Sequence, residues 1–265
     1  MLEKIILGAI QGVAEWLPVS SEGVLVLVQL RFFGGNGSLA EMVKFALFLH
    51  LGTFLAALIY FRRQVGKIVK TVFTYRKSSL EERGLVDFLL VSSSLTFLIG
   101  LLVLRFFSVF EEQLKLSGGI LSLIIGLTLM ITALLQLASK KMGSRSLDSL
   151  NLKDGFILGV VQGLAAIPGF SRSGATVSSL LLLGVEKTLA LKLSFLMSLP
   201  VVFGGNILLN LNYLAFDWQL ILALSSSFVF GILTIHFLIK AAEKINFGIF
   251  VMVFGIITVI SSLIP

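Results

Sequence analysis

Most of this chain consists of apolar stretches of the length that a lipid bilayer requires. A helix needs about 20 apolar residues to cross the hydrocarbon core. Six segments satisfy this: roughly 40–61, 85–106, 117–138, 188–212, 218–239 and 245–264. Hydrophobic residues make up 57% of the sequence and charged residues 13%, and a soluble domain of this size could not bury so much apolar surface. The sequence therefore predicts an all-α integral membrane protein.

Several classes of function are disfavoured by what the chain lacks. Cysteine is absent, which excludes disulfides, thiol catalysis and iron–sulfur clusters. His50 and His236 are the only histidines, so we do not expect a zinc site. We interpret the net charge of +7 as basic cytoplasmic loops and expect no nucleic-acid partner. Glu3 precedes the first apolar run and no small-residue cleavage site follows it, so no cleaved signal peptide is expected.

Two further apolar regions, 2–33 and 152–184, are interrupted by polar and turn-forming residues at Pro18–Gly23 and Pro168–Gly174. Each interruption leaves halves of roughly 10–16 residues, too short to cross a bilayer alone. Non-helical backbone at membrane depth persists only where protein or a water-filled cavity surrounds it. We therefore predict that each region forms a re-entrant helical hairpin, which enters and leaves on the same side.

The two interrupted regions are copies of each other. With an offset of 151, residues 6–23 and 157–174 are identical without a gap at eight of eighteen positions. Three predicted crossings follow each copy, so the second copy lies upside down relative to the first, as in many transporters. We predict a single membrane domain over 1–265, with repeat one at 1–138 and repeat two at 152–264. The fold is then six transmembrane helices plus two re-entrant helical hairpins in two inverted-topology repeats.

Basic residues are distributed unevenly between the two sides that this topology creates. Fourteen fall on one side: Arg62, Arg63, Lys67, Lys70, Arg76, Lys77, Arg83, Lys140, Lys141, Arg145, Lys153, Lys187, Lys240 and Lys244. The other side has Lys4, Arg31, Arg105 and Lys115. Cytoplasmic loops carry an excess of Lys and Arg, so the first group is predicted to be cytoplasmic. The N-terminus, the C-terminus and the first hairpin then face outward from a multi-pass protein of the plasma membrane.

The first interruption combines a carboxylate with hydroxyl groups. Gln11 and Glu15 are four residues apart and share one helix face. Ser20 and Ser21 follow Pro18, where the next half-helix is expected to begin. An ionisable residue inside a membrane segment is a candidate functional residue, so Glu15 is expected to belong to a site.

The second interruption supplies a cation instead. Ser171, Arg172 and Ser173 stand at a predicted helix start, with Thr176 one turn later. Free N–H groups and partial positive charge at a helix N-terminus suit phosphate, and the planar fork of Arg172 matches phosphate oxygens. Structural alternatives stay open. Ser20 and Ser173 are also suited to capping helices, Glu15 and Arg172 to neutralising each other, His50 to packing inside its helix, and Lys44 and Lys192 to reaching the membrane surface.

Two motifs carry a resemblance to a known family. "QGVAEWLPVSSEG" (11–23) and "PGFSRSGAT" (168–176) resemble the two signature regions of the undecaprenyl-pyrophosphate phosphatase family. The resemblance covers nearly the whole chain in length, segment order and repeat structure. It implies paired re-entrant hairpins in inverted repeats. It also implies removal of the terminal phosphate from a polyprenyl diphosphate, which regenerates the lipid carrier for cell-envelope glycan synthesis.

The resemblance also implies roles for individual residues. Gln11 and Glu15 match the family's (E/Q)xxxE pair, and Ser21 matches the serine proposed as nucleophile. The expected catalytic residues are Glu15, Ser21 and Arg172, and the expected substrate-binding residues are Gln11, Ser20, Ser171, Ser173, Thr176 and His50. Mg²⁺ or Ca²⁺ bridged through the diphosphate is expected at Glu15 and Gln11, because Mg²⁺ is usually bound in that way.

Two positions depart from the family's pattern. Val24 stands where the first motif commonly ends in histidine, and Glu22 replaces a small residue, usually Ser or Thr. Three alternatives therefore stay open for the proton of Ser21. Glu15 takes it, His50 takes it from the neighbouring helix, or the chemistry is weak or absent.

The leading interpretation is a membrane phosphohydrolase with a polyprenyl diphosphate lipid as substrate and membrane lipid around it. A transporter or flippase of the same lipid phosphates is the alternative, supported by the inverted repeat and the missing motif histidine. The other large class of membrane lipid phosphatase is disfavoured, because its SR-x5-H signature would need histidine at Ser178. A homodimer is an open alternative for the assembly.

Overall fold

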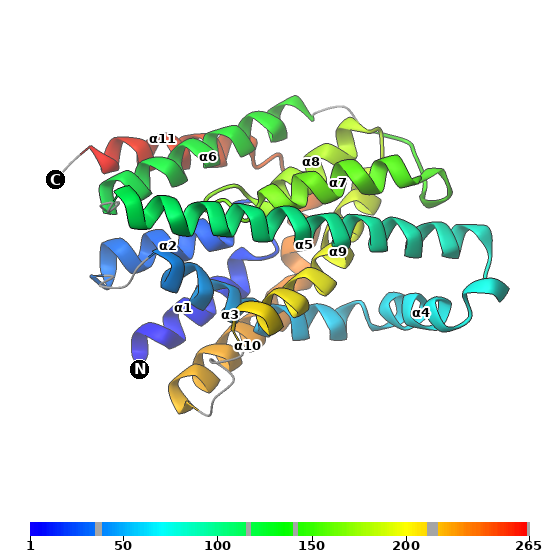
Figure 1. Ribbon diagram of the computed structural model, residues 1–265, viewed down its shortest axis with the longest axis horizontal. Helices are drawn as coiled ribbons and strands as arrows, with labels where there is room; N and C mark the ends of the chain where they lie inside the picture. Colours follow the sequence, from blue (N-terminus) through cyan, green and yellow to red (C-terminus); the bar gives the residue numbers. More distant parts are fainter. Residues whose placement is uncertain (35–38, 115–117, 140–142, 211–216, 264–265) are drawn as a thin grey trace.

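The computed structural model describes residues 1–34, 39–114, 118–139, 143–210 and 217–263 (Figure 1). Within these residues the chain is helical apart from turns, connecting segments and one bridged pair, Arg145 and Val185. The α-helices are α1 (Leu2–Ala14), α2 (Ser21–Phe32), α3 (Leu39–Tyr60), α4 (Arg62–Phe73), α5 (Leu80–Leu114), α6 (Gly118–Ala138), α7 (Leu152–Leu164), α8 (Arg172–Leu182), α9 (Lys187–Leu209), α10 (Trp218–Lys244) and α11 (Gly248–Ser262), and the 3-10 helices are η1 (Tyr75–Lys77) and η2 (Leu147–Ser149). The prediction of an all-α protein is confirmed.

Five of the described helices, α3, α5, α6, α9 and α10, are long and apolar enough to cross a membrane by length and composition. They coincide with five of the six predicted crossings, and the protein is a multi-pass membrane protein. The sixth predicted crossing, 245–264, contains α11, which has 15 residues. Such a helix is about 22 Å long, less than the roughly 30 Å hydrocarbon core. The sixth crossing therefore stays a prediction.

One helix was missed by sequence reasoning. The predicted loop 62–84 contains α4, whose apolar residues Val65, Ile68, Val69 and Val72 recur with helical spacing between the basic residues. The helix packs against α5. Three of the basic residues in the predicted charge distribution, Lys115, Lys140 and Lys141, lie outside the described residues.

The interrupted regions form two pairs of short helices. In Figure 1 both chain termini lie at the left-hand end, which we call the termini end, and α1 begins and α2 ends there. The α7–α8 pair opens toward the opposite end, where Arg145 before α7 bridges Val185 after α8. The interruptions therefore approach each other from opposite ends of the molecule.

Glycines allow the first helix of each pair to pack closely on a long helix. A Cβ on Gly8 would lie 2.2 Å from the carbonyl oxygen of Ala223 in α10. The aligned Gly159 would place one 2.8 Å from the carbonyl oxygen of Ser92 in α5. Small residues commonly allow such close contacts between helices in membranes. These glycines therefore allow α1 to pack closely on α10 and α7 on α5.

Helix α6 holds both interruptions in place. Gln136 Nε2 donates to the carbonyl oxygen of Pro18 at 2.6 Å, and Thr128 Oγ1 donates to that of Pro168 at 2.7 Å. The backbone N–H of Ser171 donates to Thr132 Oγ1 at 3.1 Å. Buried backbone groups that lack helical partners need such acceptors and donors. One face of α6 thus satisfies backbone groups of both non-helical segments.

Candidate active site

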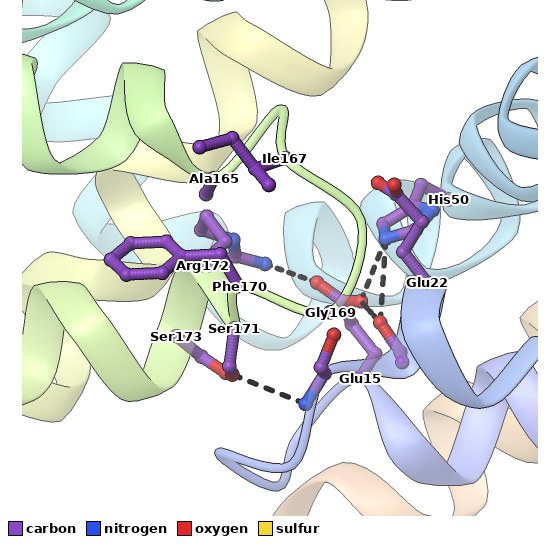
Figure 2. A pocket seen from close by; sticks show the side chains of 12 residues that line it. Glu15, Glu22, His50, Ala165, Ile167, Gly169, Phe170, Ser171, Arg172 and Ser173 are labelled. Atoms are coloured by element: carbon purple, nitrogen blue, oxygen red, sulfur yellow. Dashed lines mark hydrogen bonds and ion pairs between the residues drawn. The ribbon is translucent and has the colours of Figure 1, made fainter. Parts of the chain in front are cut away.

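The carboxylate of Glu15 lies where the two interruptions meet (Figure 2). The residue is 6% exposed, and both of its oxygens are occupied. Oε1 pairs with the guanidinium of Arg172, which lies 157 residues further along the chain. Oε2 accepts hydrogen bonds from Ser21 Oγ and Gln11 Nε2, each at 2.9 Å. It also lies 3.1 Å from His50 Nε2. Glu15 therefore joins residues from α1, α2, α3 and α8.

The hydrogen bonds of His50 define its protonation. Nδ1 lies 2.7 Å from the carbonyl oxygen of Ala46, which can only accept, so Nδ1 carries a hydrogen. Nε2 faces Glu15 Oε2 at 3.1 Å and Ser21 Oγ at 3.5 Å. A bare nitrogen lone pair would repel a carboxylate at this distance, so a proton lies between His50 and Glu15. The imidazole and the carboxylate thus form a proton-sharing pair next to the Ser21 hydroxyl.

Arg172 is held in position from the side opposite Glu15. Its Nη1 donates to the carbonyl oxygen of Ser194 at 3.2 Å, and its guanidinium lies 6.0 Å from the centre of the Phe195 ring. The Oγ of Ser194 lies 2.7 Å from Thr176 Oγ1. Thr176 was predicted to bind phosphate. In the structure it is fully buried and supports the residue that holds Arg172.

The serines join the starts of the two half-helices. Ser20 and Ser171 are the N-caps of α2 and α8, and their side chains accept from the N–H groups of Gly23 and Gly174. The N–H of Ser20 donates to Ser171 Oγ at 3.1 Å, and Ser173 Oγ donates to the carbonyl oxygen of Leu17 at 3.2 Å (Figure 2). The capping alternative therefore holds for Ser20.

The backbone of Ser20 is unusual. Its φ of 64° places a non-glycine residue in the left-handed region, which is uncommon and costs free energy unless surrounding contacts hold it. The first turns of α2 and α8 leave the N–H groups of Ser21, Glu22, Arg172 and Ser173 without an acceptor among the described residues. Such groups at helix starts suit an anion.

Two cavities meet at these residues. The smaller, about 40 Å³, is polar and is lined from both interruptions by Glu15, Ser20, Ser21, Glu22, His50, Ala165, Ile167, Gly169, Phe170, Ser171, Arg172 and Ser173 (Figure 2). The larger, about 560 Å³, is mainly apolar and is lined by α3, α5, α7 and α9. Glu22, His50 and Arg172 line both cavities, so the two spaces adjoin at the catalytic candidates.

Most of the residues predicted from the sequence come together here. Seven line the small cavity: Glu15, Ser20, Ser21, His50, Ser171, Arg172 and Ser173. Gln11 and Thr176 do not line it, because Gln11 is buried behind Glu15 and Thr176 lies behind Arg172. Sequence reasoning did not assign Glu22, Ser194 and Phe195 to the site. For Glu22, the signals in the sequence are its place one residue after Ser21 and its departure from the family's pattern.

A divalent cation at Glu15 and Gln11 stays a prediction. Both oxygens of Glu15 already have hydrogen-bond or ion-pair partners, whereas Gln11 donates through its amide nitrogen and its Oε1 is buried without a partner among the described residues. A hard cation needs several free oxygen ligands. No group of three or more metal-binding side chains occurs among the described residues. Glu22 Oε1 is the carboxylate oxygen here that is buried without a hydrogen-bond partner.

Comparison with known proteins finds the same segments in a known family. A family described as bacitracin resistance protein BacA matches residues 4–260, which includes both interruptions and all the long helices. The chain belongs to this family. Its curated relatives include proteins named undecaprenyl-diphosphatase from several archaea.

The similarity extends over nearly the full length of these relatives. The protein from Methanococcoides burtonii is 40% identical over 264 residues, covering 98% of this chain and 97% of the relative. That from Haloarcula marismortui is 36% identical over 271 residues, covering 100% and 98%. That from Methanococcus maripaludis strain C7 is 38% identical over 237 residues, covering 89% and 88%.

Proposed function

We propose that this protein is a membrane phosphohydrolase that converts a polyprenyl diphosphate of the undecaprenyl type to the monophosphate and inorganic phosphate. The monophosphate is then a recycled lipid carrier for envelope glycan synthesis. The observation that carries the proposal is the contact of a serine hydroxyl, a carboxylate and an arginine at the meeting of two helix starts. The name undecaprenyl-diphosphatase of the full-length relatives supports the same substrate.

In the first step, the terminal phosphate occupies the small cavity and takes the guanidinium of Arg172. Arg172 and the free N–H groups at the starts of α2 and α8 stabilise charge on the transferred phosphoryl. Glu15 then loses its pairing with Arg172 and becomes a stronger proton acceptor. Ser21 Oγ attacks the terminal phosphorus while its proton passes to Glu15, 2.9 Å away. The bond from phosphorus to the bridging oxygen breaks, and the prenyl monophosphate leaves with the proton from Glu15.

In the second step, water hydrolyses the phosphoserine. Glu15 takes a proton from the attacking water, inorganic phosphate leaves, and Ser21 Oγ recovers a proton from Glu15. His50 shares a proton with the same carboxylate oxygen, so it tunes Glu15 and does not accept the proton of Ser21 directly. The prenyl units next to the diphosphate occupy the adjoining apolar cavity.

The decisive experiment is phosphate release by the purified full-length protein from C15 and long-chain prenyl diphosphates. We expect inorganic phosphate and prenyl monophosphate in equal amounts. The predicted Mg²⁺ or Ca²⁺ is tested in the same assay with and without EDTA. No step above is routed through a metal, because both oxygens of Glu15 already have partners.

Binding of prenyl phosphates without phosphate release would contradict the phosphohydrolase and favour the transporter alternative. The Ser21→Ala variant is the matched control for contaminating phosphatases. Loss of activity in EDTA that returns with Mg²⁺ or Ca²⁺ would show that a cation takes part.

The two-sided topology is tested by labelling. We propose six crossings in two inverted repeats, with both termini outside, supported by the opposite openings of the two hairpins and by the basic residues of α4. Cysteines at Lys70 and at Asn212, which lies outside the described residues, should react from opposite faces, with Lys70 cytoplasmic. Labelling of both from one face would remove the inverted-repeat topology. A homodimer stays a prediction, to be measured by the mass of the protein in nanodiscs.

A further inference from the structure

The large cavity extends along α3 and α5 to the termini end of the molecule, where α3 begins and α5 ends (Figure 1), and we call this part its mouth. Lys44 in α3 and Arg105 in α5 line the same cavity as Glu22, His50 and Arg172. We propose that Lys44 and Arg105 form a capture site for the diphosphate headgroup of the lipid, separate from the catalytic position at Arg172. This inference rests on the proposed function and adds the route by which the substrate reaches the site.

The two cations are separated from the catalytic residues by an apolar passage. Lys44 precedes His50 by six residues, about 9 Å along α3, and Arg105 follows Thr96 by nine, about 14 Å along α5. Both cations are exposed. The wall between includes Leu47, Phe97, Leu101, Leu104, Val202 and Leu209. An anion that enters such a passage loses water, which costs free energy. A cation at the mouth raises the local concentration of the anion before it loses this water.

Hydrogen bonds join α3 and α9 beside the mouth. Asn210 Nδ2 donates to the carbonyl oxygen of Lys44 at 2.9 Å, and Asn206 Nδ2 donates to that of Leu47 at 2.9 Å. These buried amides hold α9 against α3. The ammonium of Lys44, in contrast, has no carboxylate within ion-pair distance among the described residues. Its backbone is thus fixed while its charge is available to a ligand.

Two further cations among the described residues at the termini end, Lys4 and Arg31, have partners outside the cavity. Lys4 Nζ lies 3.7 Å from Asp217 Oδ2, and Arg31 Nη2 donates to the carbonyl oxygen of Ser261. Neither lines the cavity. Reaching the membrane surface is the simplest account of Lys44 from the sequence alone, but the structure adds its place in the wall of a cavity that ends at Arg172. A polyprenyl diphosphate, with several negative charges on one headgroup, fits two cations at such a mouth.

The test uses the full chain in nanodiscs of phosphatidylcholine, so that the bilayer itself has no net charge. The probe is a C15 prenyl methylenebisphosphonate, which binds but has no hydrolysable anhydride. We expect Lys44→Met and Arg105→Met each to weaken its binding about threefold to tenfold, and to reduce the dependence of binding on NaCl. Lys44→Arg should retain wild-type affinity, and Lys4→Met, a cation at the same end, is the matched control.

Turnover separates capture from catalysis. Lys44→Met should raise KM for the C15 diphosphate by a similar factor while kcat at saturation stays within about twofold of wild type. Unchanged affinity in Lys44→Met, an equal loss in Lys4→Met, or a fall in kcat alone would overturn the capture site. If the wild type releases no phosphate but binds the bisphosphonate in a Lys44-dependent way, the capture site stands and the phosphohydrolase proposal fails.

Discussion

Replacing Arg172 by lysine is expected to lower phosphate release by at least about a hundredfold, although the positive charge is retained. The guanidinium uses separate nitrogens for separate partners, with Nη1 on the carbonyl oxygen of Ser194 and Nη2 on Glu15. It also lies over the Phe195 ring, 6.0 Å from the ring centre. A lysine ammonium is a compact point charge that cannot hold the Ser194 carbonyl and two phosphate oxygens in one geometry.

The measurement is kcat for the C15 diphosphate together with the affinity for the bisphosphonate. Arg31→Lys is the matched control. Arg31, at the end of α2, also donates to a carbonyl oxygen but lines neither cavity. Its activity should equal that of the wild type. Wild-type turnover in Arg172→Lys would mean that phosphate binds elsewhere.

The meeting of Glu15 and Arg172 could be predicted from the sequence because the interruption is duplicated. Eight identities between 6–23 and 157–174 place two non-helical segments at equivalent depth in related repeats. Polar groups on such segments need one another or a ligand. The residues that differ between the copies, Glu15 against Ala166 and Ser21 against Arg172, then have opposite chemistry at one place. The sequence thus indicated that the two residues share a site, with their ion pair as one open alternative.

The contacts of the supporting residues could not be predicted, because they depend on helix rotation. His50 was expected at the site, but it lies in a continuous apolar helix, and nothing in its neighbours indicates that it faces Glu15 and not lipid. Ser194 acts partly through its carbonyl oxygen, which every residue has. Glu22 lines both cavities because α2 turns that side inward. Periodicity identifies a helix, whereas its orientation depends on packing between distant segments.

The missing motif histidine leads to the last expected result. We expect Glu15→Gln to lower phosphate release by about a thousandfold, within the range for loss of a general base, and Glu15→Asp to lower it less. We expect His50→Ala to lower it by about tenfold. The reason for the difference is that Ser21 donates to Glu15 at 2.9 Å, whereas His50 Nε2 lies 3.5 Å from Ser21 and already shares a proton with Glu15.

A rescue separates the loss of an imidazole from a disturbed fold. Val24 lies three residues after Ser21 on α2, and side chains at this spacing are neighbours on a helix. In the double variant His50→Ala/Val24→His, the imidazole returns from the motif position, and we expect several-fold recovery over His50→Ala with unchanged thermal unfolding. Val24→His alone should keep or raise the wild-type rate. Full activity in Glu15→Gln with none in His50→Ala would reverse the two roles. The proton of Ser21 would then pass to His50, and Glu15 would serve to orient the imidazole.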